Sequence, residues 1–403
     1  MDIAERIQQE LLHESAGIWY LNNHLASKII VKAPSSTIKS LIKGCKIEFC
    51  FGRDQRSNPN IFHAGVRIYD DPINYLIVTE TLRFNDEHSS LQAIMNRTET
   101  HLDVYNELNV CVAVAKVHIE VKNQMKTLNL LGNIAHLYTG DFTNVISKSL
   151  DCFVHSLDKS MQFESVYEID NIVISAELSS WEENTVYFIG ENEHNKIVCM
   201  DPKEGDSFEQ QINAVMDSIF KDQVYRGPQI VKGNRKRELI DLLAFSDYGI
   251  FLIEAKALGI LNTGLNRTMD RKVKGLHQQI NKGINQLIGA VKTIANNERI
   301  YHAKNSTEIV FNRELLPHGI VLVSELFLFG DWSIIEQKIL TTIYEKKVVI
   351  HVMDLKEFMK YIGNAKGNKD LLDDLLIKRA EKFVEHMNIH LSLNTQHLPQ
   401  TEN

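Results

Sequence analysis

Residues 238–256 read ELIDLLAFSDYGIFLIEAK, and this segment determines which class of domain the C-terminal part of the chain can form. Two apolar runs flank the turn-forming residues SDYG, so we expect a β-hairpin centred on the middle of that turn. The numbers of paired residues then add up to 495 whether the loop has two or four residues. Asp241 therefore lies opposite Glu254, with their Cβ atoms about 5 Å apart. Lys256 follows two residues after Glu254 on the same face.

The two opposed carboxylates have a chemical consequence. Carboxylates on an otherwise apolar hairpin repel each other and lose solvation, so they need a compensating cation. Their oxygen atoms suit a hard divalent ion, with Mg²⁺ preferred and Mn²⁺ as a substitute. Asp241, Glu254 and Lys256 are therefore candidates for phosphodiester hydrolysis, which needs a Lewis acid, a nucleophile and charge stabilisation. Glu238 has the opposite strand parity from Asp241 and is expected to point away; the alternative is a solvated edge hairpin with incidental charges.

The segments around the hairpin alternate between helical and strand patterns. Apolar residues recur at helical spacing over residues 208–219, and Ser207-x-x-Gln210 at their start fits a capping box. After the hairpin, residues 266–275 (NRTMDRKVKG) are expected to form a basic loop that leads into a long helix from about Leu276 to Asn296. Further strands are expected at 318–329 and 348–354, and further helices at 331–345 and 354–363. This order predicts a layered α/β domain.

The charge of the chain is unevenly distributed. The net charge is −8, but residues 225–300 contain 13 basic and 6 acidic residues, which gives +7 there and −15 for the remainder. A local positive field attracts polyanions whatever the total charge. Two basic clusters flank the hairpin and are candidates for phosphate contacts, the alternative being ordinary solvated faces. The clusters are Arg235, Lys236 and Arg237, in an expected loop, and Arg271, Lys272 and Lys274.

Asp241, twelve intervening residues and then Glu254-Ala255-Lys256 resemble the D…(D/E)-x-K signature of the PD-(D/E)XK nuclease superfamily. The surroundings resemble its Mrr-like and NERD-like restriction-endonuclease branch, over about residues 205–363. The resemblance implies a restriction-endonuclease-like αβα core with a mixed sheet. It also implies that Asp241 and Glu254 bind the metal while Lys256 acts on the water or the phosphate. Ile240 stands where the nominal motif has proline, which many members lack.

The resemblance also implicates polar side chains on two neighbouring helices. A leading helix of the family often carries a glutamate, which Glu209 would match. The helix after the E-x-K strand often carries a glutamine, which Gln286 or Gln279 would match. Gly283 and Ala290 share the face of these glutamines and would let the helix approach the sheet closely. Without a role in the site, Glu209 is a first-turn glutamate favoured by the helix dipole, and the glutamines are polar residues beside a buried face.

The rest of the chain carries fewer signals. Residues 1–200 alternate β-rich runs with a few helices, which predicts an α+β domain that senses, recruits or oligomerises. The nuclease-like domain is expected at 201–365, followed by a C-terminal helix and polar tail at 366–403. The chain has neither a P-loop nor a G-x-G-x-x-G motif, so no nucleotide cofactor is expected. No apolar run approaches the roughly 20 residues that cross a bilayer, and five scattered cysteines without C-x-x-C are typical of a cytoplasmic protein.

The sequence thus predicts a cytoplasmic, Mg²⁺-dependent endonuclease that acts on DNA. The resemblance to restriction-type members implies a role in prokaryotic defence against foreign DNA. Cleavage of both strands from one active site per chain favours a dimer or a higher homo-oligomer. Two alternatives remain open: a non-catalytic nucleic-acid-binding or assembly module on a nuclease-like fold, and an RNase, which the same ion chemistry permits.

Overall fold

The structure of the chain is mixed α/β, with its strands in several mixed or antiparallel sheets. The computed structural model describes residues 2–24, 26–71, 75–161, 163–189, 194–257, 269–328 and 330–392. The chain divides into two compact units, Met1–Asn184 and Thr185–Asn403. The second unit starts before residue 201 because the hairpin of β11 (Val186–Ile189) and β12 (His194–Ile197) belongs to it. Among the described helices, none combines the length and the apolar character needed to cross a membrane.

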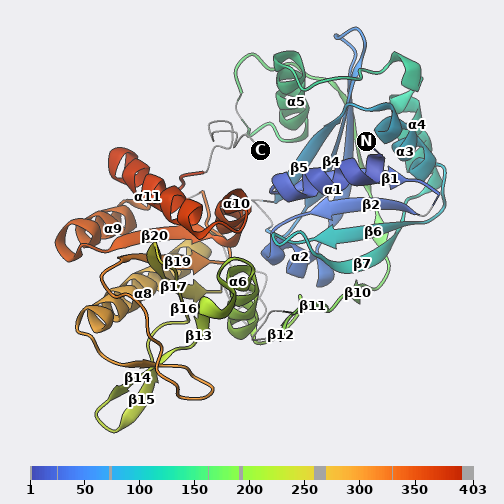
Figure 1. Ribbon diagram of the computed structural model, residues 1–403. Coiled ribbons are helices and arrows are strands. Elements are labelled where there is room, and N and C mark those ends of the chain that lie inside the picture. Colours follow the sequence, from blue (N-terminus) through green and yellow to red (C-terminus); the bar gives the residue numbers. More distant parts are fainter. Residues whose placement is uncertain are drawn as a thin grey trace. The chain divides into compact units, whose positions relative to one another are not determined.

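Two sheets form the first unit (Figure 1). One has the strand order β1-β2-β6-β7, to which the short strands β9 and β10 add, and β2 and β6 run parallel in it. The other has the antiparallel order β5-β4-β3-β8. The elements are α1 (Ile3–His13), β1 (Gly17–Asn22), β2 (Ser27–Lys32), α2 (Ser35–Ile42), β3 (Ile47–Asp54), β4 (Ile61–Ile68), β5 (Leu76–Leu82), α3 (Asn85–Met95), β6 (Thr100–Tyr105), β7 (Cys111–His118), α4 (Val121–Leu131), η1 (Ile134–His136), α5 (Asn144–Leu157), β8 (Asp170–Ser175), β9 (Glu177–Leu178) and β10 (Glu182–Glu183).

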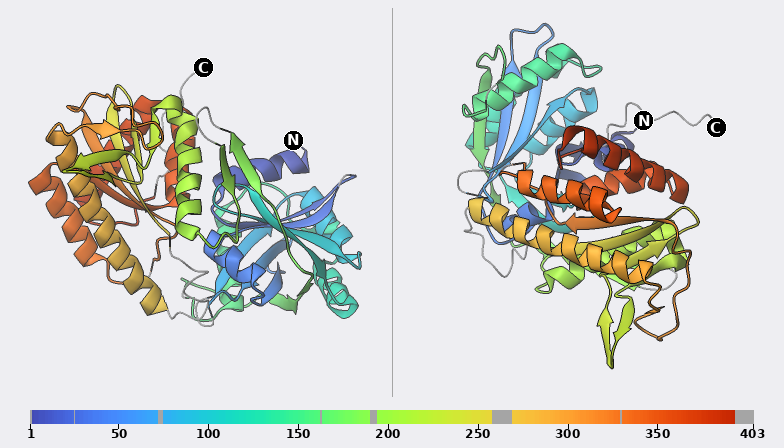
Figure 2. Two further views of the ribbon diagram at one scale, coloured as in Figure 1. Left: turned by 90° about the horizontal axis from the view of Figure 1, so that it is seen from below. Right: turned by 90° about the vertical axis from the view of Figure 1, so that its left-hand side faces the viewer.

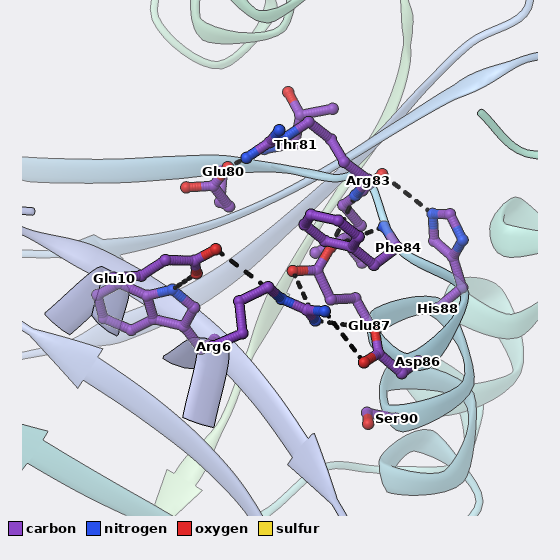
Figure 3. A network of polar contacts seen from close by, with 12 residues as sticks. Arg6, Glu10, Glu80, Thr81, Arg83, Phe84, Asp86, Glu87, His88 and Ser90 are labelled. Atoms are coloured by element: carbon purple, nitrogen blue, oxygen red, sulfur yellow. Dashed lines mark hydrogen bonds and ion pairs between the residues drawn. The ribbon is translucent and has the colours of Figure 1, made fainter. Parts of the chain in front are cut away.

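Arg6 fastens the first helix of this unit to α3 (Figure 3). Its guanidinium donates to Asp86 Oδ1 at 2.8 Å, and its Nη2 lies 3.4 Å from Glu87 Oε1. Glu87 also accepts the backbone N–H of Arg83 at 2.7 Å, and burial raises the pKa of Glu87 to about 7. Helix α1 is amphipathic and buries its apolar side against Trp19. This polar network therefore has a structural role, because it satisfies charges that the packing of α1 partly buries.

A five-stranded mixed sheet forms the centre of the second unit, in the order β13-β16-β17-β19-β20. The first three strands are antiparallel neighbours, and the last three run parallel. The elements are α6 (Glu204–Phe220), η2 (Lys221–Gln223), β13 (Val224–Arg226), β14 (Gln229–Lys232), β15 (Arg235–Glu238), β16 (Leu242–Phe245), β17 (Gly249–Lys256), α8 (Met269–Ala295), β18 (Ile300–Tyr301), β19 (Leu316–Val323), α9 (Ser333–Lys346), β20 (Val349–Asp354), α10 (Leu355–Ala365) and α11 (Lys369–His386).

Helices cover both faces of this sheet (Figure 2). The crossover helices α8 and α9 pack against each other and against β17, β19 and β20. On the other face, Phe220 of α6 packs on Phe251 of β17 with ring centroids 4.9 Å apart. Residues 249–254 of β17 are all buried, as expected of a strand covered on both sides. Leu252 belongs to the core cluster under α8, and burial of such a side chain contributes roughly 1.5–3 kcal/mol to stability.

Four local expectations were wrong. The strand expected at 318–329 is β19, which ends at Val323, and residue 329 lies outside the described residues. Helix α6 begins at Glu204, so Ser207 lies buried inside the helix and not at its cap. Helix α8 begins at Met269, so the expected basic loop is helical from that residue on, which the good helix propensity of Arg and Lys permits. Residues 232–237 do not form a loop either. They belong to a hairpin of β14 and β15, which turns at Gly233 with φ +60° and pairs with β18.

Candidate metal-binding site

The hairpin register predicted from residues 238–256 is confirmed. Leu243 pairs with Leu252, and Phe245 pairs with Ile250, so the partner numbers add up to 495. The loop has four residues and is closed by a hydrogen bond from Ser246 N to Gly249 O at 3.1 Å. The side chain of Ser246 also accepts the backbone N–H of Tyr248 at 3.2 Å. This turn fixes the alignment of the two strands, and with it the position of the residues at their far ends.

Asp241 lies immediately before β16, in a segment that backbone hydrogen bonds hold in place. Gly227 N donates to Asp241 O at 2.8 Å, and Leu239 N donates to Pro228 O at 2.8 Å. The side chain reaches across the hairpin, because Asp241 Oδ2 accepts the backbone N–H of Ala255 at 2.7 Å. The structure therefore brings Asp241 beside the Glu254-Ala255-Lys256 segment, and Oδ1 of Asp241 accepts no hydrogen bond from the described residues.

Glu254 and Lys256 form an ion pair at the end of β17. The side chain of Glu254 is 0% exposed and that of Lys256 is 11% exposed. Glu254 Oε1 accepts a hydrogen bond from Lys256 Nζ, whereas Glu254 Oε2 is buried and has no partner among the described residues. Burial, reinforced by the neighbouring charge of Asp241, raises the pKa of Glu254 to about 7, although Lys256 acts in the opposite direction. A buried carboxylate oxygen without a donor is what a cation would satisfy.

The parity argument for Glu238 does not apply in this fold. The chain leaves β15 after Glu238 and enters β16 only at Leu242, so strand alternation does not extend from one residue to the other. Burial and the charge of Asp241 raise the pKa of Glu238, and the charge of Glu238 in turn raises that of Glu254. Glu238 is thus an additional acidic neighbour that sequence alternation excluded.

Glu209 lies at the margin of this acidic group. It stands on α6, where Arg226 Nη2 from β13 approaches its Oε2 at 3.2 Å and also pairs with Asp206. Burial and the nearby charge of Asp241 raise the pKa of Glu209, while Arg226 lowers it. Glu209 is therefore close enough to Asp241 for the two charges to interact. Arg226, which the sequence did not indicate as a site residue, forms an ion pair with it.

Helix α8 approaches the site closely at Gly283, as the small residues on that face predict. A Cβ atom at Gly283 would lie 3.0 Å from Val321 Cγ1 and 3.5 Å from Glu254 Cγ. One turn further along, Gln286 is half-buried, and its Oε1 has no hydrogen-bond partner among the described residues. Gln279 is exposed, so Gln286 is the better placed of the two glutamines.

Burial raises the pKa of Asp241, while the Ala255 N–H, Lys256, Arg226 and Lys282 lower it. Lys282 is an exposed residue of α8 that the sequence reading overlooked. Arg271, Lys274 and Lys282 are all exposed on this helix; Lys274 follows Arg271 by three residues, and Lys282 follows Lys274 by eight. Residues at such spacings share one face of a helix, which is the signal that could have revealed it.

The donor set of the site fits a magnesium ion. Within the part of the chain that the structure describes, no three His, Cys, Asp or Glu side chains converge as a ready-made metal cage. Mg²⁺ usually takes one or two protein carboxylates and completes its octahedron with waters and substrate phosphates. Asp241 and Glu254 supply such a pair, and the fit is supported by Glu254 Oε2, which has no hydrogen-bond partner among the described residues.

The predicted basic residues lie on two elements of the second unit. Arg235, Lys236 and Arg237 are exposed on β15, and Lys236 Nζ donates to Ser306 Oγ at 2.8 Å. On α8, Arg271 and Lys274 are exposed, and Lys272 is half-buried.

Neither a protein-family model, nor a curated protein, nor a solved structure matches this chain.

Proposed function

We propose that the second unit is a metal-dependent phosphodiester hydrolase that cleaves DNA internally, built on a restriction-endonuclease-like core of the PD-(D/E)XK type. The observation that carries this proposal is the confirmed hairpin register. In this register the Asp241 carboxylate accepts the N–H of Ala255, beside a fully buried Glu254 whose Oε2 has no hydrogen-bond partner among the described residues. An incidental edge hairpin would leave these carboxylates in water, where neither needs a cation.

The positions of the residues support the following roles. Asp241 Oδ1 and Glu254 Oε2 would hold the ion, because the other oxygen of each carboxylate already accepts a hydrogen bond. A bound Mg²⁺ supplies Lewis acidity toward the phosphate and lowers the pKa of a coordinated water. Lys256 lies against Glu254 and would orient the attacking water or neutralise charge on the phosphate as the bond breaks. Glu209 and Gln286 would position this group from the two helices.

The surrounding positive charge supports a polyanionic substrate. Exposed cations lie on β15 and along one side of α8, and Lys282 of α8 is close enough to Asp241 to lower its pKa. Arg271 and Lys282 are eleven residues apart in the sequence, which is about 16 Å along a helix and comparable to several phosphates of one DNA strand. Phosphate contacts of this kind position the substrate without reading its sequence.

We propose defence against foreign DNA as the role of this activity.

A cleavage assay tests the proposal. Supercoiled plasmid, linear duplex DNA and RNA are each incubated with the full chain in Mg²⁺, in Mn²⁺ and in EDTA. We expect nicking and linearisation of the plasmid with either metal and none with EDTA. Asp241→Asn, Glu254→Ala and Lys256→Ala should each abolish cutting and leave most DNA binding intact. Cutting by all three variants at the wild-type rate would refute the assignment. Cleavage of RNA alone would favour the RNase alternative, and binding without any cleavage would favour a non-catalytic module.

A further inference from the structure

Strands β14 and β15 form a two-stranded ribbon that projects from the second unit (Figures 1 and 2). The strands pair from Gln229 opposite Glu238 to Lys232 opposite Arg235, and a two-residue turn joins them. Gly233, the first residue of the turn, has φ +60°, which a residue with a side chain rarely adopts. The ribbon is therefore a defined hairpin and not a flexible basic loop.

The cations of the ribbon are sorted between its two faces. Residues directly opposite each other in an antiparallel pair share a face, so Lys232, Arg235 and Arg237 lie together on the face of Ile230. All three are exposed, and within the described residues their side chains make no hydrogen bond or ion pair. Lys236 lies on the opposite face, where it donates to Ser306 Oγ at 2.8 Å. One face of the ribbon thus presents three cations that no described group neutralises.

The base of the ribbon is fixed and lies next to the candidate metal site. Ile230 is fully buried and pairs with Ile300 of β18, which anchors the ribbon in the core of the unit. Glu238, the last residue of the ribbon, stands three residues before Asp241, and Leu239 N between them donates to Pro228 O at 2.8 Å. Only four residue steps separate Arg237 from Asp241, so their backbone positions are at most about 14 Å apart.

We propose that this ribbon lies in the major groove of B-form duplex DNA, with Lys232, Arg235 and Arg237 contacting the groove and its phosphates. The inference rests on the proposed nuclease function, because it names the substrate of that site as duplex DNA. The major groove of B-DNA is about 12 Å wide and accepts a two-stranded ribbon. A ribbon in such a groove has phosphates on both sides within about that distance, which matches the short span from Arg237 to the carboxylates.

The other nucleic acids fit this surface less well. The major groove of duplex RNA is deep and narrow, so side chains on a ribbon cannot reach its floor. Single strands are usually bound by aromatic side chains on which the bases stack. Residues 229–238 read QIVKGNRKRE and include no aromatic residue. A forked, always charged guanidinium instead suits guanine edges and phosphates in a groove, and the ribbon face carries two of them.

Equilibrium binding of the full chain in EDTA, where no cleavage occurs, tests the inference. Fluorescence anisotropy compares a 30-base-pair DNA duplex with the same sequence as duplex RNA and as single-stranded DNA. We expect the wild type to bind the DNA duplex at least ten-fold more tightly than the other two. Arg235→Ala/Arg237→Ala should weaken duplex binding by roughly ten-fold or more for each arginine and reduce the slope of log K against log salt by about two. Lys346→Ala, which removes an exposed lysine at the end of α9 that has no role in the site or the ribbon, is the control and should change the affinity less than three-fold.

The outcomes separate this inference from the nuclease proposal. Equal losses in the double variant and in Lys346→Ala, wild-type binding by the double variant, or equally tight binding of RNA or single strands would each overturn the ribbon assignment. The cleavage assay on plasmid DNA is scored independently. If the wild type cuts DNA while the double variant binds normally, the ribbon inference fails and the nuclease stands. If the wild type cuts nothing while the double variant loses duplex binding, the nuclease proposal fails and the groove contact stands.

Discussion

Replacing Glu254 by Gln should change how the stability of the protein depends on pH. Burial beside Asp241 raises the pKa of Glu254 from 4.5 to about 7 in the metal-free fold. Between these two values the folded state holds a proton that the unfolded state has lost, so the free energy of unfolding falls as the pH rises through this window. Each pKa unit is worth about 1.4 kcal/mol, so the ionised carboxylate destabilises the fold by about 3 kcal/mol at pH 8 relative to pH 4.

Urea denaturation of both proteins at pH 4, 6 and 8 in EDTA measures this effect. The free energy of unfolding of the wild type minus that of Glu254→Gln should drop by about 3 kcal/mol between pH 4 and pH 8. A constant offset caused by the altered hydrogen bond to Lys256 cancels in this comparison. Glu381→Gln, on the exposed side of α11, is the matched control and should show no such drop. A difference that stays flat across the pH range would show that Glu254 is not the buried, charge-strained carboxylate described above.

Magnesium should restore the stability that the ionised Glu254 costs at pH 8, and it should do so in the wild type but not in Glu254→Gln. A ligand that binds only the folded state stabilises it by RT ln(1 + [L]/Kd), which is about 2.7 kcal/mol at a ligand concentration of 100 Kd. Adding Mg²⁺ at pH 8 should therefore raise the midpoint of unfolding of the wild type and leave that of Glu254→Gln unchanged. Equal stabilisation of both proteins would place the bound ion elsewhere.

Three further substitutions test single features of the site. Lys256→Met should slow cleavage by at least about 100-fold and leave duplex binding within a few-fold, as measured by cleavage and gel-shift assays on one preparation. Gln286→Leu removes a half-buried amide whose Oε1 has no partner among the described residues, so the free energy of unfolding should stay the same or rise while cleavage falls; an unchanged cleavage rate would exclude Gln286 from the site. Gly283→Val should destabilise the fold by about 1–3 kcal/mol in urea, because its Cβ would lie 3.0 Å from Val321 Cγ1, whereas Gly289→Val meets no atom within 4 Å and should cost less.

The centre of the second unit could be predicted from the sequence because its signals are local. Apolar runs on both sides of SDYG set the hairpin, and a period of two along each strand fixed which side chains share a face. The prediction placed Asp241 beside Glu254 for that reason. The parity argument did not apply to Glu238, because β15 and β16 are separate strands in different sheets, so strand alternation cannot be counted from Glu238 to Asp241.

Other parts depend on tertiary contacts that no local pattern shows. The segment 232–237 is rich in charge and was expected to be a loop. It forms a ribbon because β14 pairs both with β15 and, at Gln229 and Ile230, with β18 some seventy residues later. Arg226 donates a hydrogen bond to Glu209, seventeen residues earlier in the sequence. The positive charge of Lys282, on helix α8, lowers the pKa of Asp241. Contacts of this kind follow from how the elements pack, so they became visible only with the fold.

The most direct test of the metal site is the anomalous scattering of Mn²⁺ from crystals of the full chain soaked in that ion. We predict one strong peak between the carboxylates of Asp241 and Glu254, at about 2.0–2.3 Å from an oxygen of each and beside Lys256 Nζ. A structure of the soaked crystal with no peak at this position, or with Mn²⁺ bound only elsewhere, would contradict the proposed metal site and the hydrolytic function that depends on it.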